Sequence, residues 1–177
     1  MSDALVLIGG PGSGKSSVLE ALGTMLEIDG VQFGAIETEQ LARGWPWLNA
    51  TQWMPQLEAV IELQRRAGRQ TFLVAATTET DEELRAVVDA VGADRVVVVC
   101  LSAPDELAAR RVAEREPDSW PGRLALIEHA RKLGARAPID RIGEHRRRVC
   151  ATCRVAAVLG GNRCALGLWR RAIADHS

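Results

Sequence analysis

The chain has 177 residues, of which 47% are hydrophobic and 25% are charged, and its formal net charge is -1. These values are typical of a single globular domain that buries a full core, so folding needs neither disulfides nor a structural metal. The near-neutral charge gives no electrostatic reason to expect nucleic acid or a membrane surface as a partner, and the absence of a leading signal segment or long apolar run predicts a cytoplasmic protein.

The first part of the chain alternates short apolar runs with amphipathic stretches. Residues 4–8 are continuously apolar, which is typical of a strand buried on both faces, and a glycine-rich turn then leads into a helical pattern from 18 to 26. A weaker strand is predicted at 31–36. A helix is predicted at 52–67, and the glycine that follows ends it.

The same alternation continues in the middle of the chain. Residues 71–76 are the third predicted strand. Thr80 and Glu83 match a capping box, in which each side chain serves the backbone N–H of the other residue. The helix that starts there is predicted to stop at Gly92. Residues 96–101 are continuously apolar and mostly β-branched, so 95–101 are predicted as the fourth strand.

Two further helices complete the pattern. Ser102 is predicted to cap a helix that carries Pro104 in its first turn and is closed by Pro117, and another helix is predicted at 122–133. Strands that alternate with helices in this way indicate an α/β fold with a mostly parallel sheet and helices on both faces.

The turn after the first strand carries the pattern G-x-x-x-x-G-K-[ST], which is met by Gly9, Gly14, Lys15 and Ser16. Glycines let backbone N–H groups curl around phosphate oxygens, and the start of the helix adds its positive dipole end. Lys15 is expected to reach the β- and γ-phosphates of ATP, and the Ser16 hydroxyl is expected to ligate Mg²⁺. The residues expected to hold the nucleotide are Gly9, Gly10, Pro11, Gly12, Ser13, Gly14, Lys15, Ser16 and Ser17.

The loop from Gly9 to Ser16 is similar to the adenylate kinase loop, and residues 3–138 resemble the small-molecule kinases of the P-loop superfamily. These include the gluconate, shikimate, adenylylsulfate and chloramphenicol phosphotransferase-like proteins. The resemblance implies a P-loop NTPase three-layer sandwich, and an enzyme that moves the γ-phosphate of ATP to a small metabolite, nucleoside or antibiotic. An ATP-binding module that transfers nothing is the alternative, and the oligomeric state stays open.

Those families carry an acidic pair at the end of the second strand, followed by an arginine. Here Glu37, Glu39 and Arg43 have that spacing, with glutamate in place of aspartate. The resemblance implies that Glu37 accepts the proton of a substrate hydroxyl or holds Mg²⁺ through water, and that Glu39 and Arg43 contact the acceptor. In an extended strand, both carboxylates would point to the same side. The alternative is a solvated strand end.

Other candidate acceptor contacts lie near the acidic pair and after the third strand. Thr78 follows that strand, at the edge of the sheet where ligands of open α/β sheets bind, unless it only caps the next helix. Trp45, Trp47 and Trp53 lie in the region that caps the acceptor in the related kinases, which makes Trp45 a candidate contact. For at least two of the three tryptophans, packing of the cap is the preferred explanation.

After the fourth strand, the related families place a short lid that carries arginines. Arg111 and Arg115 share a helix face at i, i+4, and the resemblance implies that they close over the γ-phosphate and stabilise the charge on its oxygens. The alternative is a solvated face, in which Arg115 pairs with Glu114, Glu116 or Asp118.

The chain changes character near its C-terminal end, so we expect a kinase-like core at 1–138 and an atypical segment at 139–177 that packs on the same domain. From residue 141 onward there are eight arginines and only two acidic residues, which departs from the balanced charge of the core. The best strand candidate in this segment is 155–159, and a helix is predicted at 162–174.

This segment also contains three of the four cysteines. The candidate zinc ligands are His145, Cys150, Cys153 and Cys164, although the spacing fits no common zinc finger. A redox cysteine pair and a tail altered by a change of reading frame are the alternatives.

Overall fold

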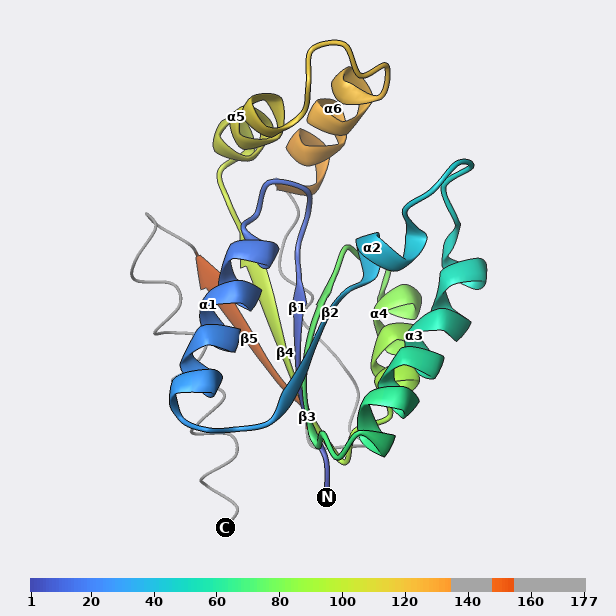
Figure 1. The fold of residues 1–177 in the computed structure, drawn as a ribbon. Coiled ribbons are helices and arrows are strands. Elements are labelled where there is room, and N and C mark those ends of the chain that lie inside the picture. The colour runs from blue at the N-terminus through green and yellow to red at the C-terminus, as the bar shows by residue number, and fades with distance from the viewer. Residues whose placement is uncertain (135–147, 155–177) are drawn as a thin grey trace.

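The computed structural model of this chain describes residues 1–134 and 148–154, and Figure 1 shows their arrangement. The elements in chain order are β1 (Asp3–Ile8), α1 (Lys15–Ile28), β2 (Phe33–Glu37), α2 (Thr38–Ala42), α3 (Ala50–Arg66), β3 (Thr71–Ala76), α4 (Asp81–Val91), β4 (Arg95–Ser102), α5 (Asp105–Arg115), α6 (Arg123–Gly134) and β5 (Arg148–Arg154). Strands and helices alternate through most of this order, as the apolar periodicity predicts.

The strands form one parallel sheet in the order β2-β3-β1-β4-β5. The central strand is β1, in which Leu5 lies opposite Leu73 of β3 on one side and Val97 of β4 on the other. Because every pair is parallel, the carboxyl ends of the strands reach the same edge of the sheet. The predicted α/β fold is therefore confirmed, and the loops that carry most candidate site residues leave from this one edge.

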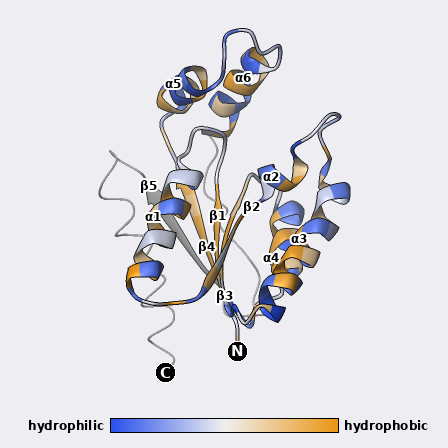
Figure 2. Ribbon diagram, in the orientation of Figure 1, coloured by the Kyte–Doolittle hydropathy of each residue, from blue (hydrophilic) through white to orange (hydrophobic). Residues whose placement is uncertain are grey.

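Helices cover both faces of the sheet and produce two separate apolar cores. In β1, Val6 and Ile8 pack in a cluster with residues of α3 and α4, whereas Leu5 and Leu7 pack in a cluster with residues of α1. The alternation explains why the run is continuously apolar, since both faces are buried. Figure 2 shows the same pattern as hydrophobic strands between helices that carry one hydrophobic face.

Helices α5 and α6 form a smaller body beyond the carboxyl ends of the strands (Figure 1). They share a third apolar cluster, which includes Ala108 and Val112 of α5 and Ile127 and Ala130 of α6. This pair of helices therefore has a core of its own. Among the helices that the structure describes, none combines the length and the apolarity needed to cross a membrane.

At the start of α4, the structure confirms one of the two hydrogen bonds of the predicted capping box and corrects the other. The helix spans Asp81–Val91, the Thr80 hydroxyl accepts from the Glu83 N–H at 3.1 Å, and Gly92 ends the helix in the left-handed conformation. The Glu83 carboxylate, however, accepts from the N–H of Glu79 and not from that of Thr80. The box is thus completed one residue earlier, by the neighbouring backbone donor.

One other local prediction is corrected by the structure, and one short helix has no counterpart among the predictions. Ser102 does not cap α5, because it is the last residue of β4 and pairs with Arg154 in the ladder; α5 begins at Asp105, with Pro104 at the N-cap position. The short helix α2, five residues long, was not predicted from the sequence. A helix of this length is too short to display a helical period of apolar residues.

The last strand also differs from the prediction. β5 spans Arg148–Arg154 and pairs with β4 in parallel, whereas the sequence favoured residues 155–159. Residues 155–159 and the helix predicted at 162–174 lie outside the described residues. The hydropathy of 148–154 is low, but the open edge of β4 supplies backbone partners whatever the side chains are, so pairing decided the strand.

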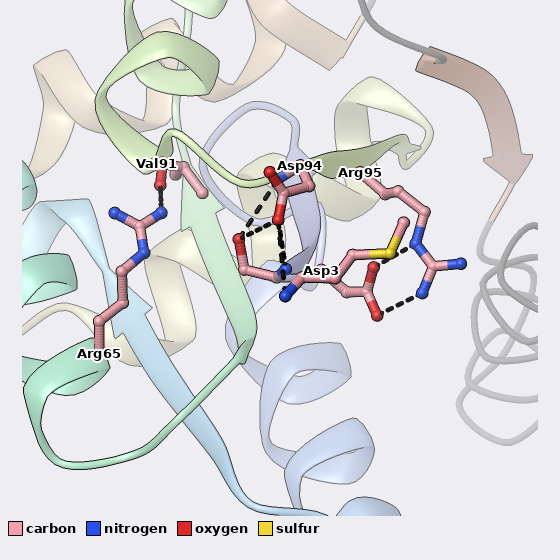
Figure 3. A network of polar contacts seen from close by, with 7 residues as sticks. Asp3, Arg65, Val91, Asp94 and Arg95 are labelled. Atoms are coloured by element: carbon pink, nitrogen blue, oxygen red, sulfur yellow. Dashed lines mark hydrogen bonds and ion pairs between the residues drawn. The ribbon is translucent and has the colours of Figure 1, made fainter.

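A polar network ties together the other end of the sheet, at the amino ends of β1 and β4 (Figure 3). Arg95 binds Asp3 through two hydrogen bonds of 2.5 and 2.8 Å, and the Asp94 carboxylate accepts from the Ser2 N–H at 2.6 Å. Arg65 of α3 donates to the Val91 carbonyl at the end of α4, at 2.6 Å. These bonds hold strands and helices at the end of the molecule away from the glycine-rich loop.

Candidate phosphate-binding site

The loop between β1 and α1 has the backbone that a phosphate cradle needs. Gly12 and Gly14 have φ angles of +76° and +96°, a left-handed conformation that side chains disfavour. A Cβ on Gly12 would also lie 2.4 Å from the carbonyl oxygen of Ala108 in α5. The loop is therefore glycine-rich both for its own geometry and because α5 packs directly on it.

Lys15 is the first residue of α1 and is only 7% exposed. Its ammonium donates to the Gly9 carbonyl at 2.9 Å and to the Gly10 carbonyl at 3.3 Å, and it lies 3.6 Å from Oε1 of Glu39. Burial lowers the pKa of Lys15 below its ordinary value, and the negative charge of Glu39 opposes this shift. The side chain is thus held inside the loop and pointed along it.

Ser16 and Glu37 bring together two oxygen groups beside Lys15. Glu37 is the last residue of β2, and its Oε2 accepts a hydrogen bond of 3.1 Å from the Ser16 hydroxyl. Oxygen ligands of this kind are the ones that Mg²⁺ prefers. The two residues lie at one end of a pocket of about 400 Å³ between α1 and β2, which is lined by Ser16, Leu19, Glu20, Gly23, Thr24, Glu27, Phe33, Ala35 and Glu37.

Glu39 reaches the site from α2, so the expectation that it lies in an extended strand is wrong. Its Oε1 accepts a 2.6 Å hydrogen bond from the Thr77 hydroxyl, after the end of β3. Burial alone would raise the pKa of Glu39, but the charge of Lys15, the Thr77 hydrogen bond and the charge of Arg115 together hold it below its usual value. The carboxylate is therefore ionised next to the lysine.

Thr77 is the residue that sequence reasoning missed. It precedes the candidate Thr78 in the hydroxyl-rich segment after β3, and this composition was the only available signal. The structure points the Thr77 hydroxyl at Glu39, whereas the Thr78 hydroxyl is buried with no hydrogen-bond partner among the described residues. The role of Thr78 as an acceptor contact stays a prediction.

The loop fits the phosphates of a nucleotide. The Ser13 hydroxyl is buried inside it and has no hydrogen-bond partner within the described part of the chain. The first N–H groups of α1, the Lys15 ammonium and this hydroxyl offer donors to phosphate oxygens, and Ser16 and Glu37 offer oxygens to a divalent cation. Pro11 is buried and Ser17 is exposed, and their roles as nucleotide contacts stay predictions.

The two arginines of α5 have different partners. Arg111 donates to the Gly12 carbonyl at 3.2 Å, so it touches the glycine-rich loop, and its role in a lid over the γ-phosphate stays a prediction. Arg115 forms a 2.7 Å ion pair with Glu116, one of the partners expected for a solvated face. Its charge nevertheless acts on Lys15 and Glu39, because it lowers the pKa of both.

Helix α6 also contacts the site, which the sequence did not predict. A Cβ on Gly10 would lie 2.7 Å from Cβ of Leu133, so the end of α6 packs on the loop. His129 of α6 lies 3.4 Å from the Glu79 carboxylate, after β3. Both helices of the small body therefore rest on loops that carry candidate site residues.

One of the three tryptophans is packed in the core and two are exposed, whereas packing was preferred for at least two of them. Trp53 is 9% exposed in the core beneath α3, whereas Trp45 and Trp47 are 98% and 58% exposed. The preference for packing at two or more of the three is therefore wrong, because the loop between α2 and α3 projects from the core. A hydrogen bond from the Leu48 N–H to the Ala42 carbonyl closes the base of this loop, beside the exposed Arg43.

The zinc hypothesis stays a prediction. Cys150 and Cys153 lie in β5, and the other two candidate ligands, His145 and Cys164, lie outside the described residues. Within residues 1–134 and 148–154, no group of three or more histidine, cysteine or acidic side chains is arranged to hold a metal ion.

Comparison with known proteins gives one consistent fold. A family profile described as AAA domain matches residues 5–132. No curated protein sequence matches the chain.

Three solved structures illustrate the fold. A gluconokinase from Sinorhizobium meliloti 1021 is 22% identical, with a TM-score of 0.61 over 99% of this chain and 98% of the other. The Mycobacterium tuberculosis APS kinase CysC in complex with AMPPNP and APS is 15% identical, with a TM-score of 0.62 over 98% of each chain. Chaetomium thermophilum Kti12 in complex with ADP-AlF3 is 14% identical, with a TM-score of 0.65 over 96% of this chain and 98% of the other.

Proposed function

Because this chain belongs to the AAA domain family and has the fold of P-loop kinases, we propose that it is an ATP-dependent phosphotransferase acting on a small molecule. The observation that carries the proposal is the meeting of two carboxylates with the two functional side chains of the loop. Glu37 bonds to Ser16, and Glu39 lies beside Lys15. A site that only held phosphates would gain nothing from the negative charge of Glu39 beside Lys15.

The loop would hold the donor ATP through its backbone N–H groups and through Lys15, whose point charge suits the β- and γ-phosphates. Ser16 and Glu37 are the residues that would hold Mg²⁺, which when bound neutralises the charge that develops on the transferred group. Arg111, already in contact with the loop, would add positive charge from the lid side. Arg115 would do so after leaving Glu116.

Glu39 is the group that we assign as general base. Its ionised carboxylate lies within an ion-pair distance of Lys15, so it is close to the place where the γ-phosphate would be held. In the proposed step the acceptor hydroxyl gives its proton to Glu39, its oxygen bonds to the γ-phosphorus, and the bond from this phosphorus to the β–γ bridging oxygen breaks to leave ADP. Arg43, Trp45 and Thr78 are candidate contacts for the acceptor.

A screen of ATP consumption tests this function across nucleosides, sugars, and aminoglycoside and phenicol antibiotics. We expect one acceptor to accelerate ADP release, and Glu39→Gln to lower that rate by about 10²–10⁴, the range for a lost general base. Glu62→Gln is the matched control, because it removes a carboxylate from an exposed ion pair with Arg66 on α3. Binding of Mg-ATP with no accelerating acceptor would instead indicate an ATP-binding module without transfer.

A further inference from the structure

The Lys15 ammonium already has protein partners for its donors. It carries three N–H groups, of which two serve the Gly9 and Gly10 carbonyls, and it faces the Glu39 carboxylate at 3.6 Å. A phosphate oxygen that binds this ammonium must take the place of one of these acceptors. The two carbonyls belong to the loop backbone, whereas Glu39 comes from a separate element and carries the same sign of charge as phosphate.

Thr77 decides where the Glu39 carboxylate lies. Its hydroxyl donates at 2.6 Å to the same oxygen, Oε1, that faces Lys15. A glutamate side chain has several rotatable bonds, and a short hydrogen bond from a residue at the end of a buried strand removes that freedom. The carboxylate is thus fixed at the lysine by a group that lies outside the loop, in the segment after β3.

We propose that Thr77 is a positioning residue that holds Glu39 on Lys15, so that Glu39 and the phosphates of the nucleotide compete for this one ammonium. The inference deepens the proposed function and rests on its nucleotide site. It assigns Glu39 two successive tasks, since the phosphate that displaces it from Lys15 also leaves its oxygen available to the acceptor hydroxyl. The competition lowers the affinity of the loop for nucleotide.

Titration calorimetry with Mg-AMPPNP tests the competition without an acceptor. We expect Glu39→Gln to bind about three- to tenfold more tightly, because one negative charge leaves the phosphate site. Glu62→Gln, which removes a carboxylate from the Arg66 ion pair, should bind as the parent protein does. Unchanged or weaker binding by Glu39→Gln would overturn the proposal.

The role of Thr77 is tested by two variants and a double mutant. Thr77→Val keeps the shape but removes the donor, so it should also tighten binding, and Thr77→Ser should restore the parent affinity. In the Glu39→Gln background, Thr77→Val should have no further effect, because Thr77 acts through Glu39. If Thr77→Val changes the Mg-AMPPNP affinity equally in the parent protein and in Glu39→Gln, Thr77 is a structural residue and its positioning role is rejected. If Thr77→Val does not fold, Thr77→Ser still decides. A serine variant that binds more weakly or more tightly than the parent protein contradicts the proposal.

The competition for Lys15 and the proposed phosphotransferase activity can be rejected independently of each other. Tighter binding by Glu39→Gln with no acceptor in the transfer screen would remove the phosphotransferase and keep the competition. Transfer to an acceptor together with unchanged Mg-AMPPNP binding by Glu39→Gln would keep the phosphotransferase and remove the competition.

Discussion

Lys15 is the single residue on which the candidate site depends most. It is buried at the start of α1, and carbonyl oxygens of the loop hold its ammonium beside an ionised carboxylate. The chain contains only one other lysine, Lys132, which lies exposed on α6 beside Glu128. No second lysine can therefore supply a point charge to the loop if Lys15 is replaced.

We expect Lys15→Ala to weaken the binding of Mg-ATP at least about tenfold, since a charge-assisted phosphate contact contributes ~1.5–3 kcal/mol. Lys132→Ala serves as the control and should leave the affinity unchanged, because its side chain lies on the outer surface of α6. Titration calorimetry measures both. Equal affinities of Lys15→Ala and the parent protein would exclude the loop as the phosphate site.

At the level of elements, the phosphate loop and α5 fit together through a glycine. Gly12 needs its left-handed conformation, and the backbone of Ala108 occupies the space where a side chain would start. Gly30 has nearly the same φ angle, +70°, but no described atom lies within 4 Å of a Cβ built on it. The two glycines therefore separate the cost of the conformation from the cost of the contact.

Gly12→Ala should lower both stability and Mg-ATP affinity, because the new methyl group pushes α5 off the loop. Gly30→Ala should lower only the free energy of unfolding, by about 1–2 kcal/mol, which is the cost of a left-handed backbone for a residue with a side chain. Thermal unfolding and titration calorimetry compare the two variants. A Gly12→Ala protein that resembles Gly30→Ala in both measurements would show that α5 is not packed on the loop.

The cap formed by α2, α3 and their loop has one tryptophan inside and two outside. Trp53→Ala should lower the free energy of unfolding by about 3–5 kcal/mol, because it leaves a cavity beneath α3. Trp45→Ala should change it by less than about 0.5 kcal/mol, because the side chain is almost fully exposed. Urea unfolding followed by circular dichroism measures both, and similar losses would contradict the exposed position of the loop.

On the scale of the whole molecule, the two ends of the sheet do different things. The carboxyl ends of β1, β2 and β3 lead into the segments that carry Lys15, Glu39 and Thr77. The amino ends are held by the polar network around Arg95, whose pKa is raised by its hydrogen bond to Asp3. The polar network that stabilises the fold and the candidate site thus lie at opposite ends of the strands.

This separation predicts that Asp3→Asn lowers stability without affecting the nucleotide site. The pair with Arg95 is largely shielded from solvent and doubly bonded, so we expect a loss of about 1–3 kcal/mol in the free energy of unfolding. Glu82→Gln, which breaks an exposed pair with Arg85, should cost less than about 1 kcal/mol. Mg-ATP affinity should be unchanged in both, and a loss of affinity in Asp3→Asn would contradict the separation.

The sequence by itself determined the features that depend on residues close together in the chain. The apolar run of β1 requires burial on both faces, and the pattern from Gly9 to Ser16 specifies its own turn. Thr80 and Gly92 mark the ends of α4 through bonds and backbone angles inside a few residues. The parallel α/β fold, the phosphate loop and most helix boundaries could therefore be predicted.

Only the tertiary structure decided the contacts between segments that are distant in the sequence. Thr77 meets Glu39 across 38 positions, and β5 pairs with β4 although its own residues are weakly apolar. Ser102 extends a strand instead of capping a helix because a partner strand lies beside it. Such outcomes depend on which backbone and charge partners the fold brings within reach, and no local pattern contains that information.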